Sequence, residues 1–403
     1  MRLLRAELEY TNMKICGIIA EYNPLHNGHV YHIGKAKEIT GCDYVVVCVS
    51  GDYVQRGLPA INDKYSRTKM ALLAGADAVI ELPVMYASSS IKYFAKAAVS
   101  ILAMIGCDYL CFGAECGDIE KLKKSAADKR VYEKENESAI AKRLKMGDSY
   151  IKALDKMGAD KIEAGSNDRL GMEYINVLYE YGFDTLPVCI KREGDYLDTD
   201  IKSGSAAAIR HALREGDFMG AREAMPQNIK LDTLIFPNDF SPLYYNKLSL
   251  CTYLGDKMPL TYYKDVSANI AGHIKNSLCA YRDIESFAAL IHSGEYTRGR
   301  IDRALLHILL EIESDFYEGD LPDDLYARLL GFKKSSKDVL AEIKKRTKIP
   351  MISKCADAKG YLNDNALYIF GKDIFASDMY EYVLSQKQGR KCICENAKGL
   401  VIC

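Results

Sequence analysis

Apolar and polar residues follow two different periods along the first half of the chain. Short apolar runs rich in β-branched residues predict strands over residues 15–21, 44–50, 78–82, 109–112 and 185–190. Helical periodicity separates them over 29–39, 64–74 and 91–105, with Gly41 and Gly75 as expected caps. Strands that alternate with helices predict a parallel sheet with right-handed crossovers. Continuous apolar strands also predict burial of this sheet on both faces.

The pattern changes further along the chain. Residues 118–165 include a stretch rich in Lys and Glu and predict a solvated helical insertion. After residue 225, helical periodicity dominates over 300–313, 324–331 and 336–346, followed by a short strand-like run at 367–370. We therefore expect an α/β fold: a Rossmann-like parallel-sheet domain over 13–225, then a mainly α-helical domain over 226–403. Residues 1–12 stand apart from this pattern and resemble an upstream extension.

Composition narrows the class of protein. A net charge of -1 does not indicate a nucleic-acid partner, so any such site must be a local patch. No apolar run reaches membrane-spanning length and no signal peptide precedes the first strand, so we expect a cytoplasmic protein. Thirteen scattered cysteines favour reduced thiols over disulfides. Cys392, Cys394 and Cys403 have unusual spacing for a metal site, and none is expected.

Two histidines mark the junction between the first predicted strand and helix. Residues 21–29 read Glu-Tyr-Asn-Pro-Leu-His-Asn-Gly-His, and the i, i+3 spacing puts His26 and His29 on one helix face. A helix N-terminus offers free N–H groups and a positive dipole end, which suit phosphate. This predicts a nucleoside triphosphate against Gly28, with both histidines donating to phosphate oxygens. A purely structural histidine pair is the alternative, and His32 is either a third residue on the ligand side or a surface residue.

A second stretch, at residues 203–210, opens another predicted helix with small and hydroxyl residues. Ser205 can cap this helix, and Arg210 adds a fixed fork of donors suited to phosphate. The alternative is an ordinary N-cap with a surface arginine. Phosphate binding is favoured because the histidine motif lies upstream in the same α/β region.

Together these stretches resemble the H-x-G-H nucleotidyltransferase superfamily, whose members carry a serine- and arginine-containing helix start late in the domain. Residues 20–29, 50–57, 67–71, 79–83, 112–115, 167–171 and 239–243 are similar to bacterial tRNA(Met) cytidine acetate ligases. The resemblance covers nearly the whole chain from Met13. It implies ATP-dependent activation of acetate to acetyl-adenylate, then acetylation of N4 of the wobble cytidine in elongator tRNA(Met).

The resemblance also implies the residues of the site. His26, His29 and Arg210 are expected to be catalytic, as donors to the charge that develops on phosphate. Lys191 is an alternative to Arg192, because this chain is one residue shorter before Tyr196 than the family pattern. Magnesium is expected to arrive with ATP, without assignable protein ligands. The residues expected to bind ATP, besides the two histidines, are Ile19, Ala20, Glu21, Tyr22, Asn23, Pro24, Leu25, Asn27, Gly28, Val30, Tyr31, His32, Gly113, Asn167, Arg192 and Ser205.

Other polar segments leave alternatives open. The loop with Gln55 and Arg56 either covers the site, meets the RNA, or is an exposed turn. A first basic group consists of Lys64, Arg67 and Lys69, and it forms either a solvated helix face or part of an electrostatic path for tRNA.

A second basic group consists of Arg298, Arg300 and Arg303. These arginines either contact RNA phosphates or pair with Asp302 and nearby glutamates. A tyrosine is expected to hold the unstacked cytidine, but the sequence does not single one out.

Three function classes remain. The leading one is the acetate–tRNA ligase, with ATP, acetate and tRNA(Met) as partners and neither DNA nor a membrane. The alternative is a small-molecule nucleotidyltransferase that transfers an adenylyl or cytidylyl group to a coenzyme precursor. A third is a non-catalytic RNA-binding protein that retains a nucleotide pocket.

Overall fold

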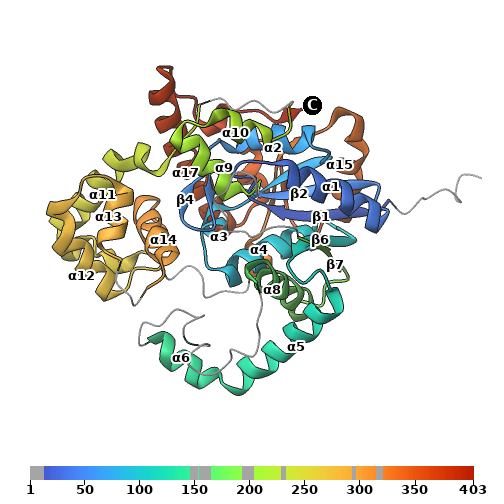
Figure 1. Ribbon diagram of the computed structural model, residues 1–403, viewed down its shortest axis with the longest axis horizontal. Helices are drawn as coiled ribbons and strands as arrows, with labels where there is room; N and C mark the ends of the chain where they lie inside the picture. The colour runs from blue at the N-terminus through green and yellow to red at the C-terminus, as the bar shows by residue number, and fades with distance from the viewer. Residues whose placement is uncertain are drawn as a thin grey trace, which may run out of the picture.

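A mixed β-sheet lies at the centre of the computed structural model, which describes residues 13–145, 153, 165–192, 204–227, 233–292, 296–314 and 321–403 (Figure 1). The strands of this sheet are β1 (Ile15–Ala20), β2 (Tyr44–Ser50), β5 (Ala78–Leu82), β6 (Tyr109–Ala114), β7 (Leu186–Lys191), β8 (Ala327–Phe332), β9 (Met351–Ile352) and β10 (Val401–Ile402). Their order is β10-β8-β5-β2-β1-β6-β7, and β9 pairs with β8. A separate antiparallel hairpin joins β3 (Tyr53–Val54) to β4 (Leu58–Pro59).

Helices cover both faces of the sheet. The helices of the first half are α1 (Asn27–Thr40), α2 (Lys64–Leu73), α3 (Val84–Ala87), α4 (Ile91–Met104), α5 (Ile119–Glu135), α6 (Glu137–Lys145), α8 (Ser166–Glu180), α9 (Ala206–Glu215) and α10 (Phe218–Glu223). Those that follow are α11 (Ser241–Leu254), α12 (Ala268–Ser277), α13 (Ile284–Leu290), α14 (Arg298–Leu309), α15 (Lys337–Arg346), α16 (Ala358–Tyr361) and α17 (Asp364–Gln388). Single 3-10 turns lie at Pro237–Phe240, Gly255–Lys257, Leu260–Tyr262, Leu278–Ala280, Leu321–Asp324, Lys334–Ser336, Cys355–Asp357 and Glu395–Ala397.

The strand-and-helix pattern of the first half is confirmed. β1, β2, β5, β6 and β7 pair in parallel with their neighbours in this set. Successive residues of β2 point to opposite faces: Val47 belongs to the core cluster that includes residues of α1, α2 and α9, whereas Cys48 belongs to the one that includes residues of α4 and α8. Gly41 caps α1 in the left-handed conformation, as expected. α2 ends at Leu73 and its C-cap is Ala74, one residue before the expected cap Gly75, which follows with a φ of 120°.

The second half differs from the expected separate helical domain. The run predicted as a helix over 324–331 holds most of strand β8, which pairs antiparallel with β5. The run predicted as a strand over 367–370 lies inside α17. Both runs are short and apolar, and such runs fit a buried helix or a buried strand equally well. Because β8 and β10 extend the sheet of the first half, the chain after residue 226 does not form one separate body.

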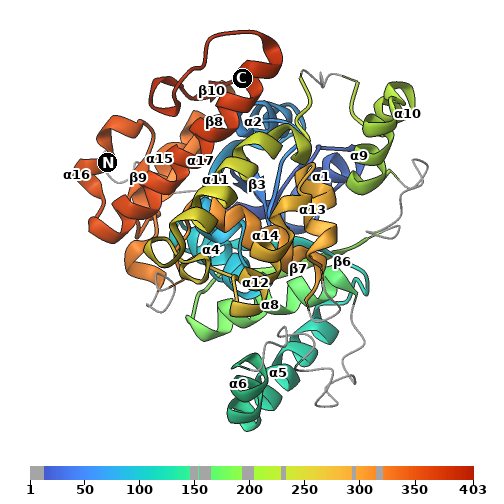
Figure 2. The ribbon, with the colours of Figure 1, turned by 90° about the vertical axis from the view of Figure 1, so that its left-hand side faces the viewer.

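Two groups of helices stand away from the sheet. Figures 1 and 2 show α11 to α14 as a lobe beside it, and α5 with α6 projecting from another side. The predicted insertion over 118–165 is helical where it is described, in α5 and α6. Residues 146–152 and 154–164 of that insertion, and residues 1–12, lie outside the described residues.

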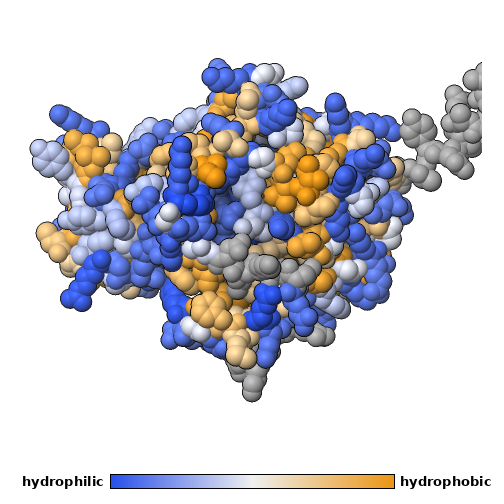
Figure 3. Space-filling view, turned by 90° about the horizontal axis from the view of Figure 1, so that it is seen from above, coloured by the Kyte–Doolittle hydropathy of each residue, from blue (hydrophilic) through white to orange (hydrophobic). Residues whose placement is uncertain are grey.

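The cysteines are reduced, as the sequence predicted, and the surface is mainly polar. All thirteen cysteines are free thiols. In the part of the chain that the structure describes, no helix is long and apolar enough to cross a membrane. Figure 3 shows a mainly hydrophilic face on which apolar side chains form separate patches.

Candidate active site

The first turn of α1 fixes the protonation of both motif histidines. His26 is the N-cap, and its Nδ1 accepts a hydrogen bond from the Gly28 N–H at 3.1 Å. His29 Nδ1 accepts from the backbone N–H of His26 at 3.2 Å. An imidazole whose Nδ1 accepts carries its proton on Nε2 when it is neutral. Each ring therefore presents an Nε2–H donor, and the two ring centroids lie 3.8 Å apart.

Glycine is required at the turn between the rings. A Cβ at Gly28 would lie 3.0 Å from the imidazole of His26, which folds back over the helix start. Such a distance is closer than most carbon contacts in proteins allow, so a side chain there would displace the capping ring.

Both histidines are neutral near pH 7. Burial, together with the charges of Arg192 and Arg210, lowers the pKa of His26 to about 4. Burial, together with the neighbouring His26, His32 and Arg192, holds the pKa of His29 well below its ordinary value. Burial and Arg192 also lower the pKa of His32 to about 4. His32 is half-buried with its Nε2 atom inside the protein, and it lies on the ligand side and not as a plain surface residue.

The turn before α1 is held in place from several directions. Arg210 Nη1 on α9 donates to the Asn23 carbonyl at 2.6 Å, and Asn23 Oδ1 accepts from the Ile61 N–H at 2.9 Å. Ser205 caps α9, accepting from the Ala208 N–H at 3.0 Å. The two predicted phosphate-binding stretches therefore touch through Arg210.

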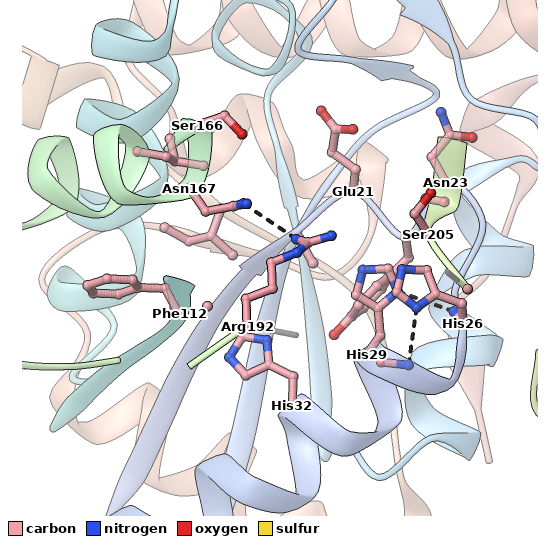
Figure 4. A pocket seen from close by; sticks show the side chains of 18 of the residues that line it. Glu21, Asn23, His26, His29, His32, Phe112, Ser166, Asn167, Arg192 and Ser205 are labelled. Carbon is pink, nitrogen blue, oxygen red and sulfur yellow. Dashed lines mark hydrogen bonds between the residues drawn. The ribbon is translucent and has the colours of Figure 1, made fainter. Parts of the chain in front are cut away.

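The opposite wall is built by β6, β7 and the start of α8. The Glu115 carboxylate accepts from the backbone N–H groups of Asn167 and Asp168 and from the Asn167 side chain at 2.7 Å. Burial opposes ionisation of Glu115, but these hydrogen bonds outweigh it and lower its pKa. Arg192 Nη1 lies 3.5 Å from Asn167 Oδ1 (Figure 4). Glu115 thus fixes Asn167, which in turn faces the arginine.

These walls enclose a cavity of about 880 Å³ at the carboxyl ends of β1, β6 and β7. That is where ligands bind in open parallel sheets. Of the predicted residues, sixteen line it: Ile19, Ala20, Glu21, Tyr22, Asn23, His26, Asn27, Gly28, His29, Tyr31, His32, Gly113, Asn167, Arg192, Ser205 and Arg210.

Three predicted residues do not line the cavity. Leu25 is fully buried in the core between the sheet and α1, and Val30 packs against the same cluster. Pro24 is buried as well. A continuous run through a turn and a helix necessarily points some side chains inward. These three residues therefore support the loop from behind.

Further cavity residues were not predicted as ligand contacts. They come from helices, from strands β6 and β7 and from the turn before α9, and sequence spacing does not bring them near the histidines. The unpredicted residues are Ile91, Phe94, Phe112, Ser166, Leu170, Tyr174, Ile190, Gly204, Ala206, Gly220, Glu223 and Ala224. Lys191, Gln55 and Arg56 also line the cavity; Gln55 is half-buried and Arg56 is exposed. The positive charge of Arg192, the residue after Lys191, contributes to lowering the pKa of His26, His29 and His32.

The first basic group is largely structural. Arg67 is completely buried, and its guanidinium donates to the carbonyls of Glu21 and Ser50 at 2.7 and 2.9 Å. Lys64 is equally buried and pairs with Glu81 and Glu395 at 2.7 and 2.8 Å. Both expected alternatives, a solvated face and a path for tRNA, are therefore wrong for these two residues. Lys69 alone is exposed.

The second basic group is mostly paired. Arg298 donates to Asp302 at 2.8 Å, and Arg303 donates to Asp265 at 3.0 Å. The Arg300 guanidinium lies over the ring of Tyr296, 4.9 Å from its centroid. Intramolecular pairing, one of the two readings left open by the sequence, thus describes Arg298 and Arg303.

The described residues bring no three His, Cys, Asp or Glu side chains together as a metal-binding group. This holds for the cysteines near the C-terminus as well. A divalent cation that enters with a nucleotide would have to be held mainly by phosphate oxygens and water, as magnesium commonly is.

Known proteins match this chain over most of its length. The family model described as HIGH Nucleotidyl Transferase matches residues 13–393. A tRNA(Met) cytidine acetate ligase of Thermoanaerobacter sp. (strain X514) is 37% identical over 387 residues, covering 91% of this chain and 95% of that protein. One from Acetivibrio thermocellus is 32% identical over 418 residues, covering 97% and 100%.

Solved structures match as well. Apo Thermotoga maritima TmcAL has a TM-score of 0.85 and 27% identity, covering 97% of this chain and 99% of its own. The same protein bound with alpha-thio ATP has a TM-score of 0.84 and 26% identity, with the same coverage. The chain therefore belongs to the HIGH nucleotidyl transferase family and, within it, to the tRNA(Met) cytidine acetate ligases.

Proposed function

We propose that this chain activates acetate with ATP, forming acetyl-adenylate and pyrophosphate, and then acetylates N4 of the wobble cytidine in elongator tRNA(Met). The observation that carries the proposal is the pair of neutral Nε2–H donors of His26 and His29 inside the cavity. Relatives named tRNA(Met) cytidine acetate ligase match the chain over nearly its whole length. A small-molecule nucleotidyltransferase would not need the lobe of α11 to α14.

The histidines act as neutral donors in this proposal. Acetate attack on the α-phosphate moves negative charge onto the phosphate oxygens and the departing pyrophosphate, and fixed donors stabilise that charge. A neutral ring whose Nδ1 accepts keeps its single N–H at Nε2, directed at the cavity. Arg210 adds positive charge beside them, and the positive dipole ends at the N-termini of α1 and α9 act in the same direction.

The remaining residues position the nucleotide. Among the described residues, a Cβ at Gly113 would meet nothing within 4 Å, so β6 leaves room for adenosine to approach its backbone. Asn167 and Arg192 would then contact the nucleotide from the ends of α8 and β7. We propose that magnesium arrives bound to ATP; none of these roles depends on it.

The tRNA is proposed to approach from the lobe. The tip of the β3–β4 hairpin lines the cavity and also touches α14: a Cβ at Gly57 would lie 2.5 Å from the backbone of Arg303. The hairpin therefore connects the lobe with the ATP site. A tRNA substrate is also the reason to propose a cytoplasmic location.

The test is to incubate the protein with ATP, labelled acetate and tRNA(Met). Label should appear in the tRNA as N4-acetylcytidine, and pyrophosphate should be released. A requirement for acetyl-CoA in place of acetate and ATP would contradict the proposal. Adenylyl transfer to a small coenzyme precursor, without tRNA labelling, would favour the alternative.

A further inference from the structure

This inference rests on the proposed function and concerns its second half-reaction. In phosphoryl and nucleotidyl transfer, the attacking and leaving oxygens lie roughly in line on opposite sides of the phosphorus. With the pyrophosphate held at His26 and His29, acetate attacks from the other side of the α-phosphate. The acetyl group is therefore left facing away from the histidines, and the cytidine amine must reach it there.

Glu21 lies on that side of the cavity. In Figure 4 its carboxylate points away from the rings of His26 and His29. Its Oε1 accepts from the backbone N–H of Gln55, at the hairpin tip, at 3.0 Å. Within the described part of the chain, Oε2 has no hydrogen-bond partner, although the side chain lines the cavity. One oxygen is thus anchored while the other remains available to a substrate.

The surroundings of Glu21 are rigid. Its carbonyl accepts from the buried guanidinium of Arg67 at 2.7 Å. The Gln55 side chain, in turn, donates to the Ser89 carbonyl at 2.8 Å. The carboxylate is therefore held at the end of β1 by α2 and the hairpin. A general base needs this kind of fixed position near the proton it accepts.

Apolar side chains line the same cavity as this carboxylate. Ile91 and Phe94, just after the Ser89 that holds Gln55, both line the cavity, as do Leu170 and Tyr174 of α8. Leu170 and Tyr174 are four residues apart and so share one face of that helix. Flat apolar and aromatic surfaces of this kind receive nucleobases that have left their stack.

We infer that Glu21 is the proton acceptor of the transfer step, and that Phe94, Leu170 and Tyr174 form the wall that receives the cytosine. A bond forms between N4 and the acetyl carbonyl carbon, and the bond from that carbon to the phosphate oxygen of AMP breaks. N4 loses one proton to Oε2 of Glu21, and the electron pair of the broken bond leaves with AMP. The products are N4-acetylcytidine, AMP and a protonated Glu21.

The first half-reaction makes no such demand. Acetate is already an anion and has no proton to lose, and a carboxylate repels it. Replacement of Glu21 by glutamine should therefore leave the acetate KM unchanged or lower it. A residue that bound acetate directly would raise that KM when it was replaced.

The test separates the two half-reactions in the full-length protein. Glu21→Gln keeps an oxygen that accepts from Gln55 but loses the base. It leaves unchanged the backbone of residue 21, which is the part of this residue expected to contact ATP and which Arg67 holds. Acetate-dependent ATP–pyrophosphate exchange should stay within about threefold of wild type, while single-turnover acetyl transfer to tRNA(Met) should fall by about 10²–10⁴-fold. Glu21→Asp retains a carboxylate and should recover part of the transfer rate. Glu38→Gln, which removes an exposed carboxylate paired with Lys35, should change neither reaction.

The outcomes of these assays distinguish failure of the inference from failure of the proposed function. Normal transfer by Glu21→Gln, or loss of exchange and transfer in parallel, would overturn the inference. A wild-type protein that cannot acetylate tRNA(Met) would instead overturn the proposed function.

Discussion

Replacing His29 by asparagine separates its two roles in the structure. Its Nδ1 accepts the His26 N–H at 3.2 Å, and its Nε2–H faces the cavity. Asparagine places a carbonyl oxygen near the position of Nδ1, so it can keep the capping bond. It has no atom near Nε2, so it loses the phosphate donor. The variant should fold normally but fail in adenylation.

The magnitude follows from comparable donors in other enzymes. Loss of one positioned donor costs about 10²–10³-fold in rate, or about 2.7–4 kcal/mol of transition-state stabilisation. Acetate-dependent ATP–pyrophosphate exchange should fall by that factor in His29→Asn, with tRNA affinity nearly unchanged. The capping bond is worth only about 0.5–1.5 kcal/mol, so the free energy of unfolding should stay close to that of wild type.

Two further variants complete the assay. His29→Ala loses both the cap and the donor, so it should lose exchange activity and a measurable part of its stability. His29→Gln places an amide near Nε2 and should recover some exchange. If His29→Asn keeps exchange within threefold of wild type, the Nε2–H group is not a phosphate donor and the reasoning is wrong.

Three other predictions concern stability and RNA binding. Glu395→Ala leaves the buried Lys64 and Arg328 with only one of their two shared carboxylates, that of Glu81, and should cost about 3–5 kcal/mol in urea unfolding. Glu38→Ala at the surface should cost less than about 0.5 kcal/mol. Below pH 6.5 the unfolded chain binds a proton at His32 that the folded chain, with its pKa lowered to about 4 by burial and Arg192, does not bind. The unfolding free energy should therefore decrease as pH falls from 6.5 to 4, and His32→Leu should remove about 1.4 kcal/mol per pH unit of that slope, whereas an unchanged slope would show that His32 is protonated in the fold. Arg298→Ala combined with Arg300→Ala should weaken tRNA binding and flatten its salt dependence in filter-binding titrations while pyrophosphate exchange persists; equal losses of both properties would show that the two sites are not separate.

The part of the site that could be predicted depends on local sequence. The histidine motif lies directly between a strand and a helix, so its geometry is set within a few residues. Gly28 illustrates this, because its role is to make room for the ring of His26 two positions earlier. The helix start at Ser205 is local in the same way.

The parts that could not be predicted depend on contacts between distant residues. Arg67 and Lys64 look like surface residues of an amphipathic helix, yet both are buried against carbonyls or carboxylates from other elements. Glu115 fixes Asn167 across a separation of 52 residues. Strand β8 finds its partner β5 almost 250 positions earlier in the chain. Periodicity along the sequence carries no signal for any of these pairings.

The central claim is that ATP binds at the carboxyl ends of β1, β6 and β7, with its phosphates on the Nε2–H groups of His26 and His29. A crystal structure of this protein with a non-hydrolysable ATP analogue tests it most directly. The account predicts phosphate oxygens within hydrogen-bond distance of both Nε2 atoms, while each Nδ1 keeps its backbone N–H. A nucleotide whose phosphates lie elsewhere in the cavity, with both rings uncontacted, would contradict it.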